Sequence, residues 1–169
     1  SRIGCTSFFP SKPLGCYGDG GAIFTNDPEL AKIIRQIARH GEDGRYNHIR
    51  IGVNSRLDSI QAAILIEKLN ILDNEVRLRN IVAAHYESSL SSCSSVICPK
   101  VKKGRLCSWA QYTLRVSKRD KLREFLDNAK ISTSIHYPKA LNRQLAVNSP
   151  ETYEKSEKSA EEVVSIPIS

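Results

Sequence analysis

The fold is decided by the stretch Ser7-Phe8-Phe9-Pro10-Ser11-Lys12-Pro13-Leu14-Gly15-Cys16-Tyr17-Gly18-Asp19-Gly20-Gly21-Ala22. The apolar residues 3–9 predict a short buried strand that runs into it, and residues 22–25 predict a second strand after it. Two prolines flank Lys12 and stiffen the intervening loop, and the glycines that follow permit close approach to a ligand or to another part of the chain. We therefore expect a lysine held in a stiff, glycine-rich loop at the end of a strand.

Lys12 has two interpretations when only its spacing is considered. A lysine amine attacks a carbonyl when desolvation or a nearby cation favours its neutral form. The alternative is an ordinary solvated charge in a loop. Ser7, at the end of the first strand, offers a hydroxyl group that can bind a phosphate.

The rest of the sequence predicts further helices and strands. Asp27 precedes Pro28 and predicts the N-cap of a helix that extends to about His40. Apolar residues repeat at helical spacing from Leu57 to about Ser89, with Ser55 as the expected N-cap, and predict a long helix bridging two packing units. The later pattern predicts an α+β unit with a strand over 110–116, a helix over 119–128, a strand over 131–137 and a helix over 154–164.

The charge of the chain is concentrated in one segment. The 169 residues carry a formal net charge of +7, and residues 100–123 contain nine basic side chains and a single acidic one, Asp120. Such a segment is a solvated loop and helix face, an attractant for an anionic small substrate, or a nucleic-acid-binding surface. The absence of an aromatic-rich stacking face and of a groove-reading motif favours the solvated face over nucleic acid.

Cysteine usage and hydropathy exclude several classes of protein. The five cysteines include no C-x-x-C pair and no histidine at ligand spacing, so we expect neither a zinc site nor a disulfide framework. A reduced, cytoplasmic chain is the simpler interpretation. No apolar run approaches the ~20 residues needed for a membrane span. Because the sequence begins Ser1-Arg2 without Met or a signal pattern, we expect a portion of a longer protein.

The stretch around Lys12 resembles the cofactor-lysine segment of the DegT/DnrJ-type nucleotide-sugar aminotransferases, which are fold-type I enzymes that use pyridoxal 5'-phosphate (PLP). Gly52-Val53-Asn54-Ser55-Arg56-Leu57-Asp58-Ser59-Ile60-Gln61-Ala62-Ala63 is similar to the second signature of this family, and Ile135-His136-Tyr137-Pro138 is similar to a third. The resemblance implies an α/β fold in which residues 1–70 end the large PLP-binding domain. Residues 71–169 would form a small C-terminal α+β domain, joined to the large domain by the long helix.

The resemblance also implies roles for particular residues. Lys12 would bind PLP covalently and then shuttle a proton between the cofactor and the substrate carbon, while Ser7 would bind the PLP phosphate. Asn54 would reach the phosphate of PLP bound mainly by the partner subunit, which implies a homodimer with active sites at its interface. Arg56, His136 and Tyr137 would approach the nucleotide sugar or the donor carboxylate. No residue is assigned to a metal.

Each of these assignments has a structural alternative. Asn54 and Ser55 can cap the long helix, and Arg56 can form an ordinary surface ion pair. His136, two residues before Pro138, can be a structural residue at the end of a strand.

The implied reaction transfers an amino group from glutamate to a keto nucleotide sugar. This version of the lysine motif is most similar to enzymes that aminate a 3-keto UDP-N-acetylglucosaminuronate for the synthesis of lipopolysaccharide and other surface polysaccharides. Amination at C4 of a 4-keto-6-deoxy sugar is the alternative. In the family, the acid that pairs with the pyridinium nitrogen precedes the lysine, so we expect this chain alone to be inactive. The alternative to an enzyme is a catalytically silent homologue with a role in dimerisation or regulation.

Overall fold

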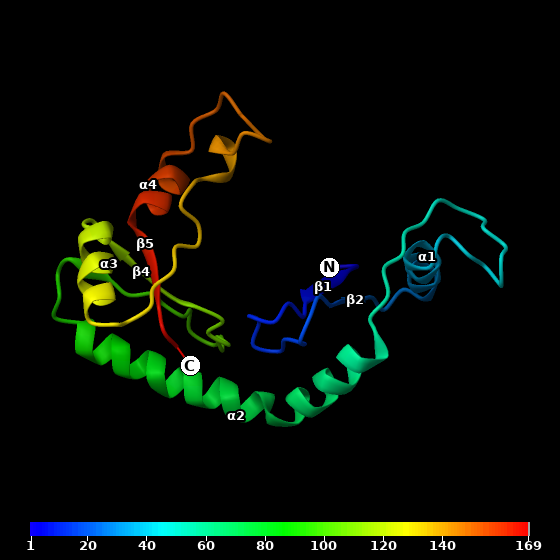
Figure 1. Cartoon of the computed structure of the whole chain (residues 1–169), viewed down its shortest axis with the longest axis horizontal. Helices are drawn as coiled ribbons and strands as arrows, with labels where there is room; N and C mark the ends of the chain where they lie inside the picture. The colour runs from blue at the N-terminus through cyan, green and yellow to red at the C-terminus, as the bar shows by residue number, and fades with distance from the viewer. Residues whose placement is uncertain (169) are drawn as a thin grey trace. The chain divides into compact units, whose positions relative to one another are not determined.

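The computed structural model describes residues 1–168 and contains two compact units, Ser1–Asp73 and a second unit that begins at Asn74. Figure 1 shows the order of the helices and strands along the chain. Their bounds are β1 (Gly4–Ser7), β2 (Gly21–Phe24), α1 (Pro28–Ala38), α2 (Ser59–Leu90), β3 (Val96–Ile97), β4 (Tyr112–Val116), α3 (Arg119–Asn128), the 3-10 helix η1 (Leu141–Arg143), α4 (Glu154–Glu162) and β5 (Val163–Ile166).

Strands β1 and β2 form an antiparallel ladder in the first unit, with Gly4 opposite Phe24 and Ser7 opposite Gly21. Both strands were predicted, but the expected burial of the first was wrong. All residues of β1 are exposed, because within residues 1–168 this two-stranded sheet has no layer that covers it. The ladder fixes the two ends of the loop that carries Lys12.

Helix α1 begins where the sequence predicted. The side chain of Asp27 accepts a hydrogen bond from the Leu30 backbone N–H at 3.0 Å, and Pro28 occupies the first turn. This hydrogen bond is the main cause that lowers the pKa of Asp27, and a hydrogen bond from the Arg2 side chain lowers it further. After the helix ends at Ala38 the chain makes a long loop and returns, and the Val53 N–H donates to the Ile37 carbonyl at 2.7 Å.

Helix α2 occupies Ser59–Leu90, close to the predicted range, but the prediction that Ser55 caps it was wrong. The Asp58 carbonyl accepts the first helical hydrogen bond, from the Ala62 N–H at 2.9 Å. Ser55 lies before that turn, and its N–H donates to the Ala38 carbonyl at 2.9 Å. Ser55 therefore lies outside the capping position, and its backbone is bound to the end of α1 instead.

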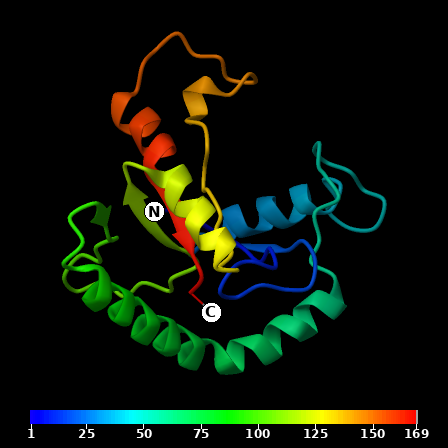
Figure 2. The same cartoon turned by 60° about the vertical axis from the view of Figure 1, so that its left-hand side comes forward.

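The second unit is built on the antiparallel sheet β3–β4–β5. One face of this sheet packs on the second half of α2, which runs beside it in Figure 2. The core of this packing consists of Ala83, Trp109, Tyr112, Leu114, Val116, Val164 and Ile168. Burial raises the pKa of the Tyr112 phenol in this core. Because successive side chains of β4 point to opposite faces of the sheet, Thr113 and Arg115 lie on the other, more polar face.

Two predictions for the second unit need correction. The last helix ends at Glu162 instead of continuing to Val164, because the β-branched residues Val163 and Val164 pair with β4 as strand β5. Residues 131–137 do not form the predicted strand: only Ser134 forms a bridge, to Ser165. The predicted strand over 110–116 and the predicted helix over 119–128 are confirmed as β4 and α3.

The cysteines of the described chain are all free thiols. Residues 1–168 contain no cluster of histidine, cysteine and acidic side chains that could hold a metal ion. Within the same residues, no helix has the length and apolar character that crossing a membrane requires.

Candidate functional site

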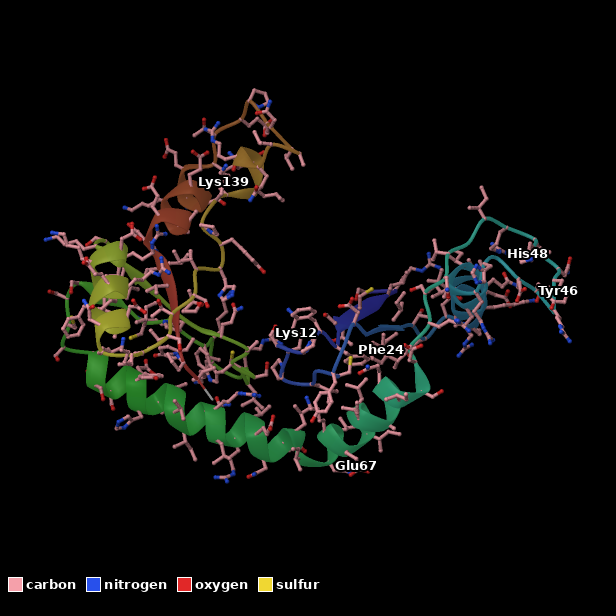
Figure 3. All side chains as sticks on the ribbon, viewed as in Figure 1. Lys12, Phe24, Tyr46, His48, Glu67 and Lys139 are labelled. Atoms are coloured by element: carbon pink, nitrogen blue, oxygen red, sulfur yellow. The ribbon has the colours of Figure 1, made fainter. Side chains whose placement is uncertain are left out.

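Lys12 and Ser7 lie in one tight turn at the end of β1. The Lys12 backbone N–H donates to the Phe9 carbonyl at 2.9 Å, and the Phe9 N–H donates to Ser7 Oγ at 3.2 Å. These two hydrogen bonds fold the segment between the residues, while the Lys12 side chain remains exposed on the loop (Figure 3). The structure therefore places a primary amine and a hydroxyl group in the same turn.

The inner side of this loop is closely packed. A Cβ atom added at Gly15 would lie 2.7 Å from the carbonyl oxygens of both Phe9 and Pro10, so only glycine fits this position. Cys16 is fully buried, and its thiol hydrogen-bonds to the carbonyl oxygens of Phe8 and Gly18, both at 3.0 Å. This packing supports the Lys12 loop from within.

Helix α2 holds the same loop from outside, through a pair of residues that we call the loop clamp: Gln61 and Lys68. Gln61 Oε1 accepts a hydrogen bond from the Tyr17 backbone N–H at 2.8 Å. Lys68 Nζ donates to the Gly15 carbonyl at 2.6 Å and lies 4.8 Å from the centroid of the Tyr17 ring. Sequence reasoning did not assign these two side chains, although their spacing of seven residues places them on one face of the helix.

Asn54 and Arg56 form a separate group in the first unit. Arg56 Nε donates to Asn54 Oδ1 at 3.1 Å, and the backbone of Asn54 forms an isolated antiparallel bridge with that of Arg39. Both side chains are exposed, so the guanidinium group and the amide are open to an anion from outside the chain. The long loop before them carries Tyr46 and His48 (Figure 3).

His136 and Tyr137 lie in the second unit. His136 Nδ1 is 3.1 Å from Ser165 Oγ, and its ring meets that of Tyr137 edge-on, with centroids 5.6 Å apart. Tyr137 is 71% exposed, whereas His136 is half-buried. The structure thus groups the predicted site residues in pairs: Ser7 with Lys12, Asn54 with Arg56, and His136 with Tyr137.

Part of the basic segment has a structural role. Arg115 forms an ion pair with Glu162 at 2.6 Å, and Arg119 Nη1 donates to the Ala160 carbonyl at 2.5 Å. Arg123 Nε donates to Thr133 Oγ1 at 3.3 Å. The hydrogen bond from Arg115 is the main cause that lowers the pKa of Glu162. These arginines join β4 and α3 to neighbouring segments instead of forming a free cationic surface.

Comparison with known proteins agrees with the motif around Lys12. All of the sequence, residues 1–169, matches the profile of the DegT/DnrJ/EryC1/StrS aminotransferase family. The chain belongs to this family. It is 52% identical over 169 residues to the UDP-2-acetamido-2-deoxy-3-oxo-D-glucuronate aminotransferase of Pseudomonas aeruginosa, with 99% of this chain and 47% of the relative covered. It is 44% identical to a pleiotropic regulatory protein of Geobacillus stearothermophilus, with 96% of this chain and 45% of the relative covered.

Solved structures support the same assignment. A DegT/DnrJ/EryC1/StrS aminotransferase from Brucella abortus superposes with a TM-score of 0.93 and 42% identity, with 99% of this chain and 46% of that chain covered. The fold is therefore that of an α/β fragment of the PLP fold-type I enzymes. The chain spans about half the length of the curated relatives it matches.

The family's aminotransferases depend on PLP, and a related structure from Bacillus subtilis, 25% identical with a TM-score of 0.85 and with 99% of this chain and 41% of that chain covered, contains the cofactor PMP. The residues around Lys12 fit such a group. A primary amine matches the carbonyl of pyridoxal, and the neighbouring Ser7 hydroxyl matches a phosphate oxygen. Both groups belong to one turn, as a small cofactor with one carbonyl and one phosphate requires.

Proposed function

We propose that the protein carrying this chain is a PLP-dependent aminotransferase that moves an amino group from glutamate to a keto nucleotide sugar. The observation that carries the proposal is the hydrogen-bonded turn that contains both Ser7 and Lys12, in a chain whose relatives are sugar aminotransferases. A lysine that is only a solvated charge needs no such support from buried packing and from a clamp on α2.

Two residues of the Lys12 loop would perform the central tasks. The Lys12 amine would bind the carbonyl of PLP covalently and, once displaced by the amino donor, would take and return a proton at Nζ. The Ser7 hydroxyl would hold the cofactor phosphate. When bound, PLP supplies an electron sink that stabilises negative charge on the substrate carbon.

Three further residues would bind anionic groups. The planar fork of Arg56 suits a carboxylate or a phosphate, and Asn54 supports its orientation through their hydrogen bond. We assign Asn54 to the cofactor phosphate across a homodimer interface, and Arg56, His136 and Tyr137 to the nucleotide sugar or to the donor carboxylate. The exposure of Asn54 and Arg56 supports a role toward a second subunit or a ligand.

We assign the first unit to the end of the large PLP-binding domain and the second unit to the small C-terminal domain. The boundary between the units at Asp73 lies within α2, so this helix is the element that would join the domains. The free cysteines support a reducing, cytoplasmic location.

The proposed substrate is a UDP-linked 3-keto N-acetylglucosaminuronate, used for surface polysaccharide. The 52% identity to the Pseudomonas aeruginosa enzyme supports this choice. Several other relatives carry position 3 in their names, among them a dTDP-3-amino-3,4,6-trideoxy-alpha-D-glucose transaminase of Streptomyces venezuelae, 38% identical, with 99% of this chain and 45% of the relative covered. These names favour amination at C3 over amination at C4.

A catalytically silent homologue is the second candidate, and the similarity to a regulatory protein favours it. One experiment separates the two candidates. The full-length protein is incubated with PLP, reduced with borohydride and mapped by mass spectrometry, before and after addition of glutamate.

An enzyme will show the cofactor attached to the peptide of Lys12, and glutamate will remove that attachment. Lys12→Ala will abolish the attachment, whereas Lys32→Ala on α1 will leave it unchanged. A full-length protein that never acquires the cofactor would instead be the silent homologue.

A further inference from the structure

The hydroxyl groups of Thr113 and Ser165 and the imidazole of His136 form one chain of hydrogen bonds. Thr113 Oγ1 lies 2.9 Å from Ser165 Oγ, which in turn lies 3.1 Å from His136 Nδ1. Ser165 is 6% exposed, so the middle hydroxyl is shielded from water. These hydrogen bonds therefore connect the His136 imidazole to the polar face of the β3–β4–β5 sheet.

The backbone fixes the three residues that form these hydrogen bonds. Thr113 and Ser165 are directly opposite each other in the β4–β5 ladder, which brings their side chains together on one face. The segment leading to His136 is tied to the same strand: the Ser165 N–H donates to the Ser134 carbonyl at 2.7 Å, and the Ser134 N–H donates to the Ser165 carbonyl at 3.1 Å. The imidazole thus meets a preformed hydroxyl partner.

The number of protein acceptors favours one direction for this row of hydrogen bonds. Among residues 1–168, Ser165 Oγ is the hydrogen-bond partner of the Thr113 hydroxyl. If Ser165 donated to Thr113, the Thr113 proton would have no protein acceptor; in the opposite direction both hydroxyl protons are used. In that direction Thr113 donates to Ser165, and Ser165 donates to His136 Nδ1. A neutral ring that accepts at Nδ1 carries its proton on Nε2.

We propose that Thr113 and Ser165 are positioning residues that place the proton of the neutral His136 ring on Nε2, so that the ring donates a hydrogen bond to a substrate oxygen. Nucleotide sugars offer acceptors for such a donor in their diphosphate, carboxylate and keto oxygens. The identity of the substrate rests on the proposed function above, whereas the position of the proton on the ring does not.

The position of the proton is measured by NMR on the full-length protein labelled with 15N-histidine, at a pH at which the ring is neutral. His136→Gln identifies the signals of His136. We expect a single tautomer, protonated at Nε2, in the wild type, and the mixture of tautomers typical of free imidazole in Ser165→Ala. A proton on Nδ1 in the wild type, or the same mixture in wild type and Ser165→Ala, would overturn the proposal.

A matched pair of variants tests Thr113. Thr113→Val removes the hydroxyl with little change of shape, and we expect it to shift His136 toward the mixture; Thr113→Ser keeps the hydroxyl and should retain the wild-type spectrum. An unchanged spectrum in Thr113→Val would overturn the part assigned to Thr113.

Kinetics test the consequence for the substrate. With glutamate and UDP-2-acetamido-2-deoxy-3-oxo-D-glucuronate, Ser165→Ala should raise KM for the sugar about three- to tenfold and change kcat less than about twofold. A purely structural role would lower both thermal stability and kcat, and this result would overturn the proposal. Absence of turnover in the wild type would refute the proposed function, while the NMR result would still decide the tautomer.

Discussion

The side-chain oxygen of Gln61 on α2 accepts a hydrogen bond from the backbone N–H of Tyr17, 44 residues earlier in the chain, at 2.8 Å. This contact connects a long helix to the loop of the candidate cofactor lysine. Gln61 and Lys68 hold the last part of that loop, while the buried Cys16 holds its inner side. The position of Lys12 therefore depends on residues that need not touch a cofactor themselves.

Gln61→Leu should loosen the loop without unfolding the protein. The substitution keeps a side chain of similar size and removes the acceptor of the Tyr17 N–H, which corresponds to about 1 kcal/mol of local stability. Hydrogen exchange of the amides in residues 13–21 should become about fivefold faster. Glu67→Leu on the same helix is the control and should leave this exchange unchanged. Equal exchange in the two variants would contradict the role of the clamp.

Lys68→Met should weaken the same loop by a different route. Methionine retains the apolar stem, but it removes both the hydrogen bond to the Gly15 carbonyl and the cation over the Tyr17 ring. The expected loss of local stability is about 1–2 kcal/mol. Lys68→Arg retains the positive charge and should lose less. The affinity of the full-length protein for PLP, measured by titration, should fall in the order wild type, Lys68→Arg, Lys68→Met.

Gly15→Ala should be severely damaging, because the new Cβ atom would lie 2.7 Å from two backbone carbonyl oxygens. The backbone must move to accommodate it, at a cost of about 2 kcal/mol or more. We expect reduced binding of PLP and a lower melting temperature. In Gly4→Ala the nearest atom is 4.0 Å away, so this variant should behave like the wild type. Normal binding of PLP by Gly15→Ala would show that the loop does not need its tight packing.

The Arg115–Glu162 pair should contribute to stability in a pH-dependent way. The pKa of Glu162 is lowered, chiefly by the hydrogen bond from Arg115, from its usual value of 4.5. A lowered folded-state pKa stabilises the protein above the unfolded-state value, and this stabilisation disappears as the pH falls through the folded-state value. Urea unfolding of wild type and Glu162→Gln should therefore differ at pH 7, and the difference should begin to shrink as the pH falls below about 4.5. A constant difference across this range would contradict the assignment.

The sequence predicted those features whose causes are local. Asp27 caps α1 because donor and acceptor are three residues apart, and the apolar repeat of α2 is visible without knowledge of its partners. The motif around Lys12 predicted the family, which the profile match confirms. The roles of the individual site residues remain predictions, which the experiments above address.

The features that the sequence did not predict depend on distant partners. Ser55 looked like a cap, but its N–H bonds to Ala38. Gln61 and Lys68 contact residues 44 and 53 positions earlier, so no local pattern marks them. Strand β5 follows α4 without a break, and only pairing with β4 distinguishes its first residues from a last helical turn.

The burial of Cys16 makes this thiol a natural reporter of loop opening. Cys5 and Cys93 are exposed and will react with an alkylating reagent at once, whereas Cys16 can react only when the loop around Lys12 opens. The alkylation rate of Cys16 therefore measures how often this loop opens, although Lys12 itself is on the exposed side of the loop. A ligand that holds Lys12 in place should therefore slow the alkylation of the buried Cys16.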